Sequence, residues 1–308
     1  MFLKKLKYAF FLLLLASCVF TTSEPVVILI HGSFAVQEPW ARPYGDFYQE
    51  LETQSMGFGL KLVPFSWSGT PTVQELFAAA MRLIRLIESY PEQEEKILIG
   101  HSHGGNIINL ASRFIGRVDL SPFNEDKLKE IVQSLEDPVQ YYDQKRPQNN
   151  KKTNDITVPG HPGLSVTPTT RDVTSKKYLF DEVYLLATPV DTVRFKPNMN
   201  VIGCLYNFYS TGDLVQTIGG SYDQAYKHDQ DGIFNFSIML KNSGHFGSDY
   251  PTHSTIHGPV IGYWILHVPE LVRACTGGKS PKRPVGLFEN FDGHIYFEAG
   301  KVPVYKRA

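Results

Sequence analysis

The sequence predicts an α/β protein whose central sheet is mostly parallel and doubly wound, with helices on both faces. Short apolar runs such as 26–30 (VVILI) and 96–99 (KILI) are typical of strands that are buried on both faces. Segments with helical spacing of their apolar residues alternate with these runs, and a glycine-rich turn at 100–105 joins one strand directly to the next helix. Strands and helices that alternate in this way indicate parallel βαβ units.

The N-terminal half supplies three strands and three helices in alternation. We expect strands over 26–30, 60–65 and 96–99, and helices over 44–56, 73–90 and 106–115. The helix over 73–90 carries one apolar stripe along its length, and Pro91 ends it because proline cannot continue a helix. These elements account for half of a doubly wound sheet.

The pattern is interrupted between residues 119 and 177 and then returns. This insertion holds an amphipathic helix over 125–135 and a polar, proline- and lysine-rich run over 137–174. It is too long for an ordinary connection, so we interpret it as an excursion that is either partly disordered or a cap over a site. The remaining expected elements are strands over 182–187, 201–209 and 234–240, a last helix over 259–275, and a tail over 276–308 that adds a surface hairpin. One domain over 25–275, with the insertion and the packed tail, is the predicted organisation.

Composition excludes several classes of protein. Hydrophobic residues make up 42% of the 308 residues and charged residues 20%, so the chain can build a large core and is not compositionally disordered. A net charge of −1 argues against a nucleic-acid partner, which requires a concentrated basic face. Three cysteines with no C-x-x-C pair exclude a disulfide scaffold and argue against structural zinc. No metal and no organic cofactor is predicted.

The N-terminus has the features of an export signal. Three lysines within residues 1–7 precede the apolar run 8–15 (YAFFLLLL), which is too short to span a membrane comfortably. The sequence Leu15-Ala16-Ser17-Cys18 resembles the lipobox of bacterial lipoproteins. We therefore expect residues 1–17 to be removed and Cys18 to be lipidated, which anchors the protein at the cell envelope. An ordinary signal peptide cut near Ala16 or Cys18, giving a periplasmic or secreted protein, is the alternative.

The strongest chemical motif is Gly100-His101-Ser102-His103-Gly104, which follows a strand and opens a helix. G-x-S-x-G in this context is a nucleophile elbow, a tight turn from which the serine projects. Side chains at Gly100 and Gly104 would collide with the strand or a neighbouring helix. A serine at a helix N-terminus is also close to free N–H groups that favour an oxyanion. Ser102 is the predicted nucleophile; a structural or phosphate-binding turn is the alternative.

With the elbow in place, the chain resembles the α/β-hydrolases of the lipase and esterase kind. The resemblance covers roughly 25–118 and 180–272 and rests on four segments that each follow a strand: LIHG at 29–32, FSWSG at 65–69, the elbow, and LATP at 186–189. It implies an oxyanion hole made by the backbone N–H groups of Ser33 and His103, and a lid between the elbow helix and the next strand. No mechanism is assigned to Trp67-Ser68-Gly69 from the sequence.

The resemblance also implies a catalytic acid beyond a later strand and then a histidine. Asp213 follows the strand and turn LYNFYSTG, and is preferred over Asp191, which follows an earlier strand. Three histidines come after the strand 234–240. His253, immediately before the last helix, is the preferred base, and His245 and His257 are the alternatives.

These residues predict a serine hydrolase that cleaves small-molecule or lipid esters or thioesters through an acyl-serine intermediate. Ser102 would attack the carbonyl carbon, His253 would accept the proton, and Asp213 would orient the imidazole. Two other functions use the same fold. An amidase or peptidase would employ the same triad, and a binding protein at the envelope would have kept the fold without turnover.

Overall fold

The computed structural model describes residues 25–92, 94–115, 178–191, 194–218, 223–226, 232–269, 291–299, 301 and 303–307. The predicted signal segment 1–17, Cys18 and the predicted insertion 119–177 lie outside the described residues. Among the residues that are described, no helix is long and apolar enough to cross a membrane.

A single eight-stranded sheet forms the centre of the molecule, in the order β2-β1-β3-β4-β5-β6-β7-β8. The first seven strands along the chain pair in parallel, and β8 is antiparallel at the edge. Their bounds are β1 Val26–Ile30, β2 Lys61–Phe65, β3 Lys96–His101, β4 Phe180–Leu186, β5 Ile202–Tyr209, β6 Ile233–Leu240, β7 Phe291–Phe297 and β8 Val304–Arg307. The prediction of a mostly parallel sheet is confirmed.

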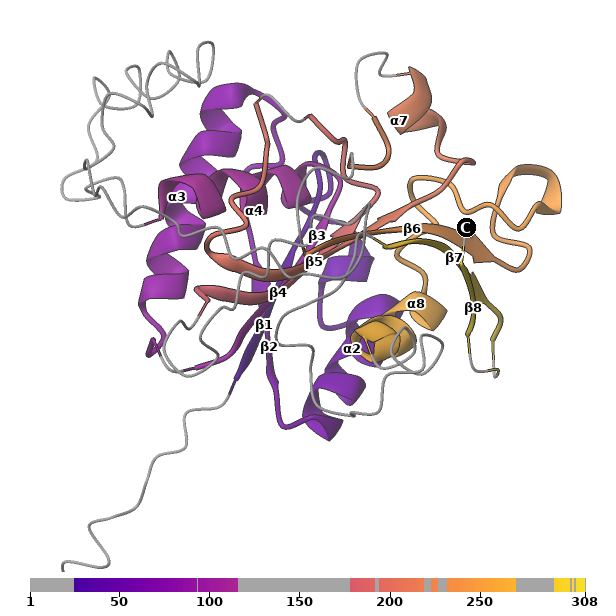
Figure 1. Ribbon diagram of the computed structural model, residues 1–308, viewed down its shortest axis with the longest axis horizontal. Coiled ribbons are helices and arrows are strands. Elements are labelled where there is room, and N and C mark those ends of the chain that lie inside the picture. Colours follow the sequence, from indigo (N-terminus) through magenta and orange to yellow (C-terminus); the bar gives the residue numbers. More distant parts are fainter. Residues whose placement is uncertain are drawn as a thin grey trace, which may run out of the picture.

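Helices cover both faces of the sheet, as predicted. Figure 1 shows α3 and α4 on one side and α2 and α8 on the other. The two faces are two separate cores, because successive residues of a strand point to opposite sides. In β1, Val26, Ile28 and Ile30 pack with α3 and α4, whereas Val27 and Leu29 pack with α2. All five residues are buried, which explains why the strand is continuously apolar.

Three helices, α2, α3 and α4, begin and end within three residues of the predicted bounds, whereas α7 was not predicted from the sequence. The described helices are α2 Asp46–Gly57, α3 Val73–Glu88, α4 His103–Phe114, α7 Leu214–Ile218 and α8 Pro259–Trp264, with single 3-10 turns η1 Pro39–Ala41, η2 His245–Gly247 and η3 Ile265–His267. The Thr72 side chain accepts a hydrogen bond from the Glu75 N–H group and so fixes the start of α3. α4 begins directly after Ser102, three residues earlier than predicted.

The last predicted helix, 259–275, is interrupted within the described residues. α8 ends at Trp264 and a 3-10 turn, η3, follows it. Pro269 gives the physical reason, because it has no N–H group to donate to the carbonyl of Ile265. The continuous helix expected from the apolar pattern is therefore broken by a tighter turn at 265–267, after which residues 268 and 269 are again helical.

The parallel strands all point their carboxyl ends toward one edge of the sheet. β1, β2, β3, β5 and β6 end there at Ile30, Phe65, His101, Tyr209 and Leu240. Each is followed by a segment that the sequence singled out, namely LIHG, WSG, the elbow, Asp213 and the three histidines. Open parallel sheets bind ligands outside this edge, so the candidate site is where the topology favours one.

Candidate active site

Ser102 occupies a strained position at the junction of β3 and α4. Its φ is 53° and its ψ is −129°, a conformation that L-residues rarely adopt. Its N–H group donates to the carbonyl of Leu186 at 2.8 Å, which continues the pairing of β3 with β4 through the turn. The sheet therefore holds the strained serine in place at the N-terminus of α4.

Two glycines make the sharp turn possible. A Cβ atom on Gly100 would lie 2.6 Å from the nitrogen of Gly105, at the start of α4. A Cβ atom on Gly104 would lie 2.5 Å from the carbonyl oxygen of Ile30, at the end of β1. Both distances are far shorter than any real contact, so the collisions expected from the sequence are confirmed, with the helix at Gly100 and with a strand at Gly104.

Asp213 is completely buried just beyond the end of β5. Its N–H group donates to the carbonyl of Ser210 at 3.0 Å, which closes the turn after the strand. One carboxylate oxygen, Oδ1, accepts the N–H of Gln216 at 3.1 Å and caps the short helix α7. The capping role that a turn aspartate commonly has thus fixes the carboxylate and leaves Oδ2 for a second partner.

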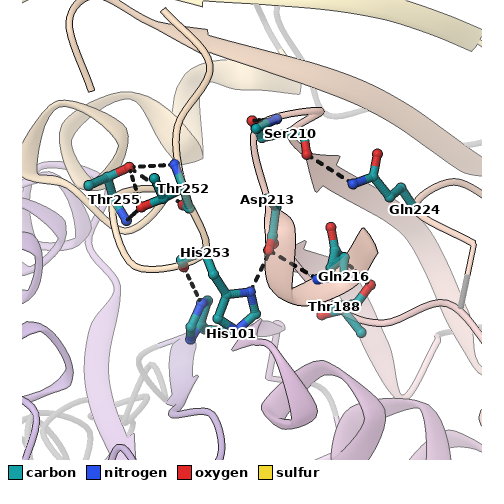
Figure 2. A network of polar contacts seen from close by, with 10 residues as sticks. His101, Thr188, Ser210, Asp213, Gln216, Gln224, Thr252, His253 and Thr255 are labelled. Atoms are coloured by element: carbon teal, nitrogen blue, oxygen red, sulfur yellow. Dashed lines mark hydrogen bonds and ion pairs between the residues drawn. The ribbon is translucent and has the colours of Figure 1, made fainter. Parts of the chain in front are cut away.

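His253 is that partner. Its Nδ1 is 2.8 Å from Oδ2 of Asp213, and Figure 2 shows the imidazole lying between Asp213 and His101. With Nδ1–H donated to the carboxylate, Nε2 is the nitrogen able to accept a proton. The side chain of His253 is 17% exposed whereas that of Asp213 is fully buried, so the pair faces solvent only through the imidazole.

The backbone that carries His253 is also fixed. Nε2 of His101, the residue before Ser102, donates to the main-chain carbonyl of His253 at 2.9 Å. On either side of His253, Thr252 and Thr255 bond to each other, with the Thr252 N–H donating to Oγ1 of Thr255 at 2.7 Å. The elbow is therefore bonded directly to the loop that carries His253. The sequence could not reveal this role of His101, because the contact joins residues 152 positions apart.

The other candidate residues make different contacts. His257 is partly buried and stacks on Trp40, with ring centroids 4.5 Å apart. His245 is exposed in η2 and lines an open surface cavity of about 430 Å³. Asp191 forms an ion pair with Arg194, with Nε and Oδ2 2.6 Å apart. Of the three histidines, the structure brings His253 to Asp213.

The two expected oxyanion-hole donors lie on either side of Ser102. His103 is the first residue of α4, so its N–H group has no acceptor within the helix. Ser33 follows Gly32, and a Cβ atom on Gly32 would be 2.9 Å from Cβ of Ser102. The loop after β1 thus approaches the serine as closely as a glycine allows. Both donors would be backbone groups, which explains why their side chains follow no catalytic pattern.

Four further histidines close to the site are held neutral. Burial is the main cause in each case; it lowers the pKa of His31, lowers that of His101 well below its usual range, and lowers those of His103 and His257 to about 4. The proximity of His253 lowers the pKa of the last three further. His253 therefore has no permanently charged histidine beside it, and Asp213 is the charge that it faces at 2.8 Å.

These lowered pKa values predict a loss of stability in acid. Below pH 6.5 the unfolded chain protonates the histidines while the folded chain does not, so the free energy of unfolding falls until the pH reaches the folded pKa. For His257 the interval from 6.5 to about 4 corresponds to roughly 3 kcal/mol. His257→Phe, which keeps a ring against Trp40, should remove this share of the pH dependence.

Urea unfolding at pH 7 and at pH 4.5 gives the change in the free energy of unfolding between the two pH values. The effect of His257 is the difference between this change in the wild type and in His257→Phe. His294→Gln is the matched control, because it removes an exposed histidine on β7 and leaves the buried histidines in place. An identical pH dependence in His257→Phe and in the wild type would show that His257 does not resist protonation in the folded state.

The order of the strands and the placement of these residues define the fold. The elbow follows the third strand of the chain, the acid follows the fifth and the histidine follows the sixth, all at one edge of a parallel sheet. The chain has the α/β-hydrolase fold. Within the described ranges, no group of three or more His, Cys, Asp or Glu side chains could hold a metal ion.

Comparisons with known proteins find similarity only at the level of solved structures. No protein-family model matches the chain, and no curated protein does. A cutinase-like protein from Cryptococcus sp. is 19% identical with a TM-score of 0.25, over 31% of this chain and 46% of that one. An acetyl xylan esterase is 12% identical with a TM-score of 0.23, over 30% and 48%. A metagenomic carboxyl esterase is 8% identical with a TM-score of 0.29, over 72% and 52%.

The chain thus spans about half the length of each of these structures. At such identities and TM-scores the matches assign no activity to this chain. Its chemistry has to be judged from its own residues.

Proposed function

We propose that the protein is a serine hydrolase that cleaves carboxylic ester or thioester bonds through an acyl-serine intermediate. The observation that carries the proposal is the hydrogen bond between His253 Nδ1 and the buried carboxylate of Asp213. A histidine oriented in this way, on a loop tied to the residue before a strained serine, is what nucleophilic catalysis by a hydroxyl group requires.

In the proposed mechanism, Ser102 Oγ adds to the carbonyl carbon of the ester while Nε2 of His253 accepts the hydroxyl proton. The imidazolium that forms is stabilised by Asp213, which stays ionised. When the tetrahedral intermediate collapses, His253 returns the proton to the departing alcohol or thiol, and the acyl group remains on Ser102. Water then repeats the sequence and releases the acid.

The negative charge of the tetrahedral intermediate would be held by the N–H groups of Ser33 and His103. Donors placed in advance at this position are typically worth about 10² to 10³ in rate each. His103 also benefits from the dipole of α4, whose positive end lies at the serine. Anchoring at the envelope through Cys18 is a separate proposal that rests on the sequence.

The proposal is tested with substrates that share one acyl group and differ in their leaving group. We expect the purified protein to hydrolyse butyrate esters and butyryl thioesters, with a pre-steady-state burst on the substrates whose acylation is faster than deacylation, and to cleave the matching anilide far more slowly. Comparable rates on the anilide would favour the amidase alternative. No turnover and no burst by the folded protein on any substrate would favour a binding protein.

A further inference from the structure

Trp67, which the sequence left without a mechanism, binds the loop that follows β1. Its indole Nε1–H donates to the main-chain carbonyl of His31 at 2.8 Å, and its own N–H group donates to Nε2 of His31 at 3.3 Å. The two rings stack with centroids 5.7 Å apart and an angle of 16°. Both side chains are almost completely buried. The segment after β2 therefore fixes both the backbone and the ring of His31.

The ring of His31 in turn fixes the peptide group that precedes Ser33. Because Nε2 accepts from Trp67, the proton of the neutral ring is on Nδ1, which donates to the carbonyl of Gly32 at 2.8 Å. The C=O and N–H groups of a trans peptide point in opposite directions. With the Gly32 carbonyl held toward His31, the N–H of Ser33 must point away from it.

The other side of Ser33 is held by Gly69. The N–H group of Phe34 donates to the carbonyl of Gly69 at 2.9 Å. Gly69 has a φ of +75°, and a Cβ atom there would lie 2.9 Å from Cγ2 of Val36 and 3.2 Å from the nitrogen of Phe34. Only glycine can present its carbonyl in this geometry without displacing the loop.

We propose that Trp67 and Gly69 are positioning residues that clamp the loop 31–34 so that the Ser33 N–H group is aimed at the oxyanion. The inference rests on the proposed hydrolase function. Trp67 acts through His31 on the peptide before Ser33, and Gly69 acts on the peptide after it. A rotation of the peptide before Ser33 would turn the donor away, and a shift of the peptide after it would move the backbone of Ser33 and displace the donor. A misplaced donor stabilises the transition state no better than an absent one.

Trp67→Phe tests the first half of the clamp, because it keeps an aromatic ring but removes the indole N–H. We expect kcat for an ester to fall roughly 10- to 100-fold with little change in KM, since the interaction is made only in the transition state. Trp264→Phe is the matched control: Trp264 packs against Tyr263 and His267 on α8 and η3, and its replacement should leave kcat unchanged.

The adduct with a trifluoromethyl ketone provides a second measurement, the pKa of its oxygen, which a general loss of stability does not change. Ser102 Oγ adds to the carbonyl carbon of the ketone, the C=O electron pair moves to oxygen, and His253 takes the hydroxyl proton, which gives a tetrahedral oxyanion. The pKa of that oxygen, followed by ¹³C NMR of a labelled ketone, should rise in Trp67→Phe by about one unit for each tenfold loss in kcat.

Gly69→Ala tests the second half with an unusually close control. Gly59 also has a positive φ, +69°, but a Cβ atom there would have no neighbour within 4 Å. Gly59→Ala therefore carries the same backbone strain without touching the loop. We expect Gly69→Ala to lower kcat and raise the pKa of the adduct, and Gly59→Ala to cost stability alone.

The outcomes separate the inference from the function on which it rests. If the wild type neither hydrolyses esters nor forms the ketone adduct, the proposed hydrolase function fails. If the wild type does both, but Trp67→Phe and Gly69→Ala match their controls in kcat and in adduct pKa, the clamp is overturned and the hydrolase stands. Should Trp67→Phe not be recovered folded, the pair Gly69→Ala and Gly59→Ala decides the question.

Discussion

Ser102→Ala is expected to lower ester hydrolysis by roughly 10⁵- to 10⁶-fold while the protein stays folded. The loss is this large because the hydroxyl oxygen forms the covalent bond to the substrate, and no neighbouring group can replace it. Alanine accepts the φ of 53° about as poorly as serine does, so the free energy of unfolding should hardly change. Steady-state hydrolysis and urea unfolding measure the two quantities.

Ser102→Gly adds a test of the backbone strain at this position. It should be as inactive as Ser102→Ala, but more stable than it by about 1 kcal/mol, because glycine relieves the strain of the elbow. If either variant retained substantial activity, Ser102 would not be the nucleophile. If Ser102→Gly were the less stable of the two, the elbow would not be strained in solution.

Asp213→Asn is expected to lower kcat by about 10⁴-fold, with the fold retained. The amide is nearly the same size as the carboxylate and can still accept the N–H of Gln216 and cap α7. It can, however, offer its NH₂ group to Nδ1 of His253, which would leave the proton on Nε2 and prevent that nitrogen from accepting one from Ser102. The expected defect is thus in proton acceptance.

Asp191→Asn is the matched control for Asp213→Asn, since Asp191 is the other acid that the sequence offered. It is expected to break the ion pair with Arg194 while keeping nearly wild-type kcat. The pH dependence of kcat/KM for each variant identifies which carboxylate serves the base. A large defect in Asp191→Asn combined with an active Asp213→Asn would exchange the roles of the two acids.

The fold could be predicted largely from the sequence, because burial on two faces leaves a strong signal. Each residue of β1 packs into one core or the other, so the strand reads as a continuous apolar run. The sequence predicts a start of α4 at residue 106, three residues too late, because His103, Gly104 and Gly105 have low helix propensity and the steric demands of the elbow override it. The interruption near Trp264 could have been found from Pro269.

The choice among three histidines depends on how the loop after β6 folds. The Leu240 N–H group donates to the carbonyl of Asp249 at 2.7 Å, so residues 241–249 leave the strand and return to its end. His253 therefore lies close beyond the end of β6 in space, whereas His245 lies on the excursion. Nothing in the sequence alone indicates that this loop closes on itself.

The contacts of Trp67 and His101 could not be predicted from the sequence, because each joins residues that are far apart along the chain. Trp67 reaches His31 across 36 positions and His101 reaches His253 across 152. The first contact depends on strand order, because β1 lies between β2 and β3 and the segments that follow these strands meet. The second also needs the loop after β6 to reach past the carboxyl ends of β4 and β5, which separate β6 from β3. The motifs can be found in the sequence, but the residues that they contact can be identified only once the order of the strands in the sheet is known.

Labelling with a fluorophosphonate probe tests the central claim most directly, because the probe reacts with a serine only when a base has activated it. The wild type should gain one adduct, which peptide mass spectrometry places on Ser102. Labelling should be lost in His253→Ala and kept in His245→Ala and His257→Phe. An adduct on another residue, or undiminished labelling of Ser102 in His253→Ala, would contradict the account.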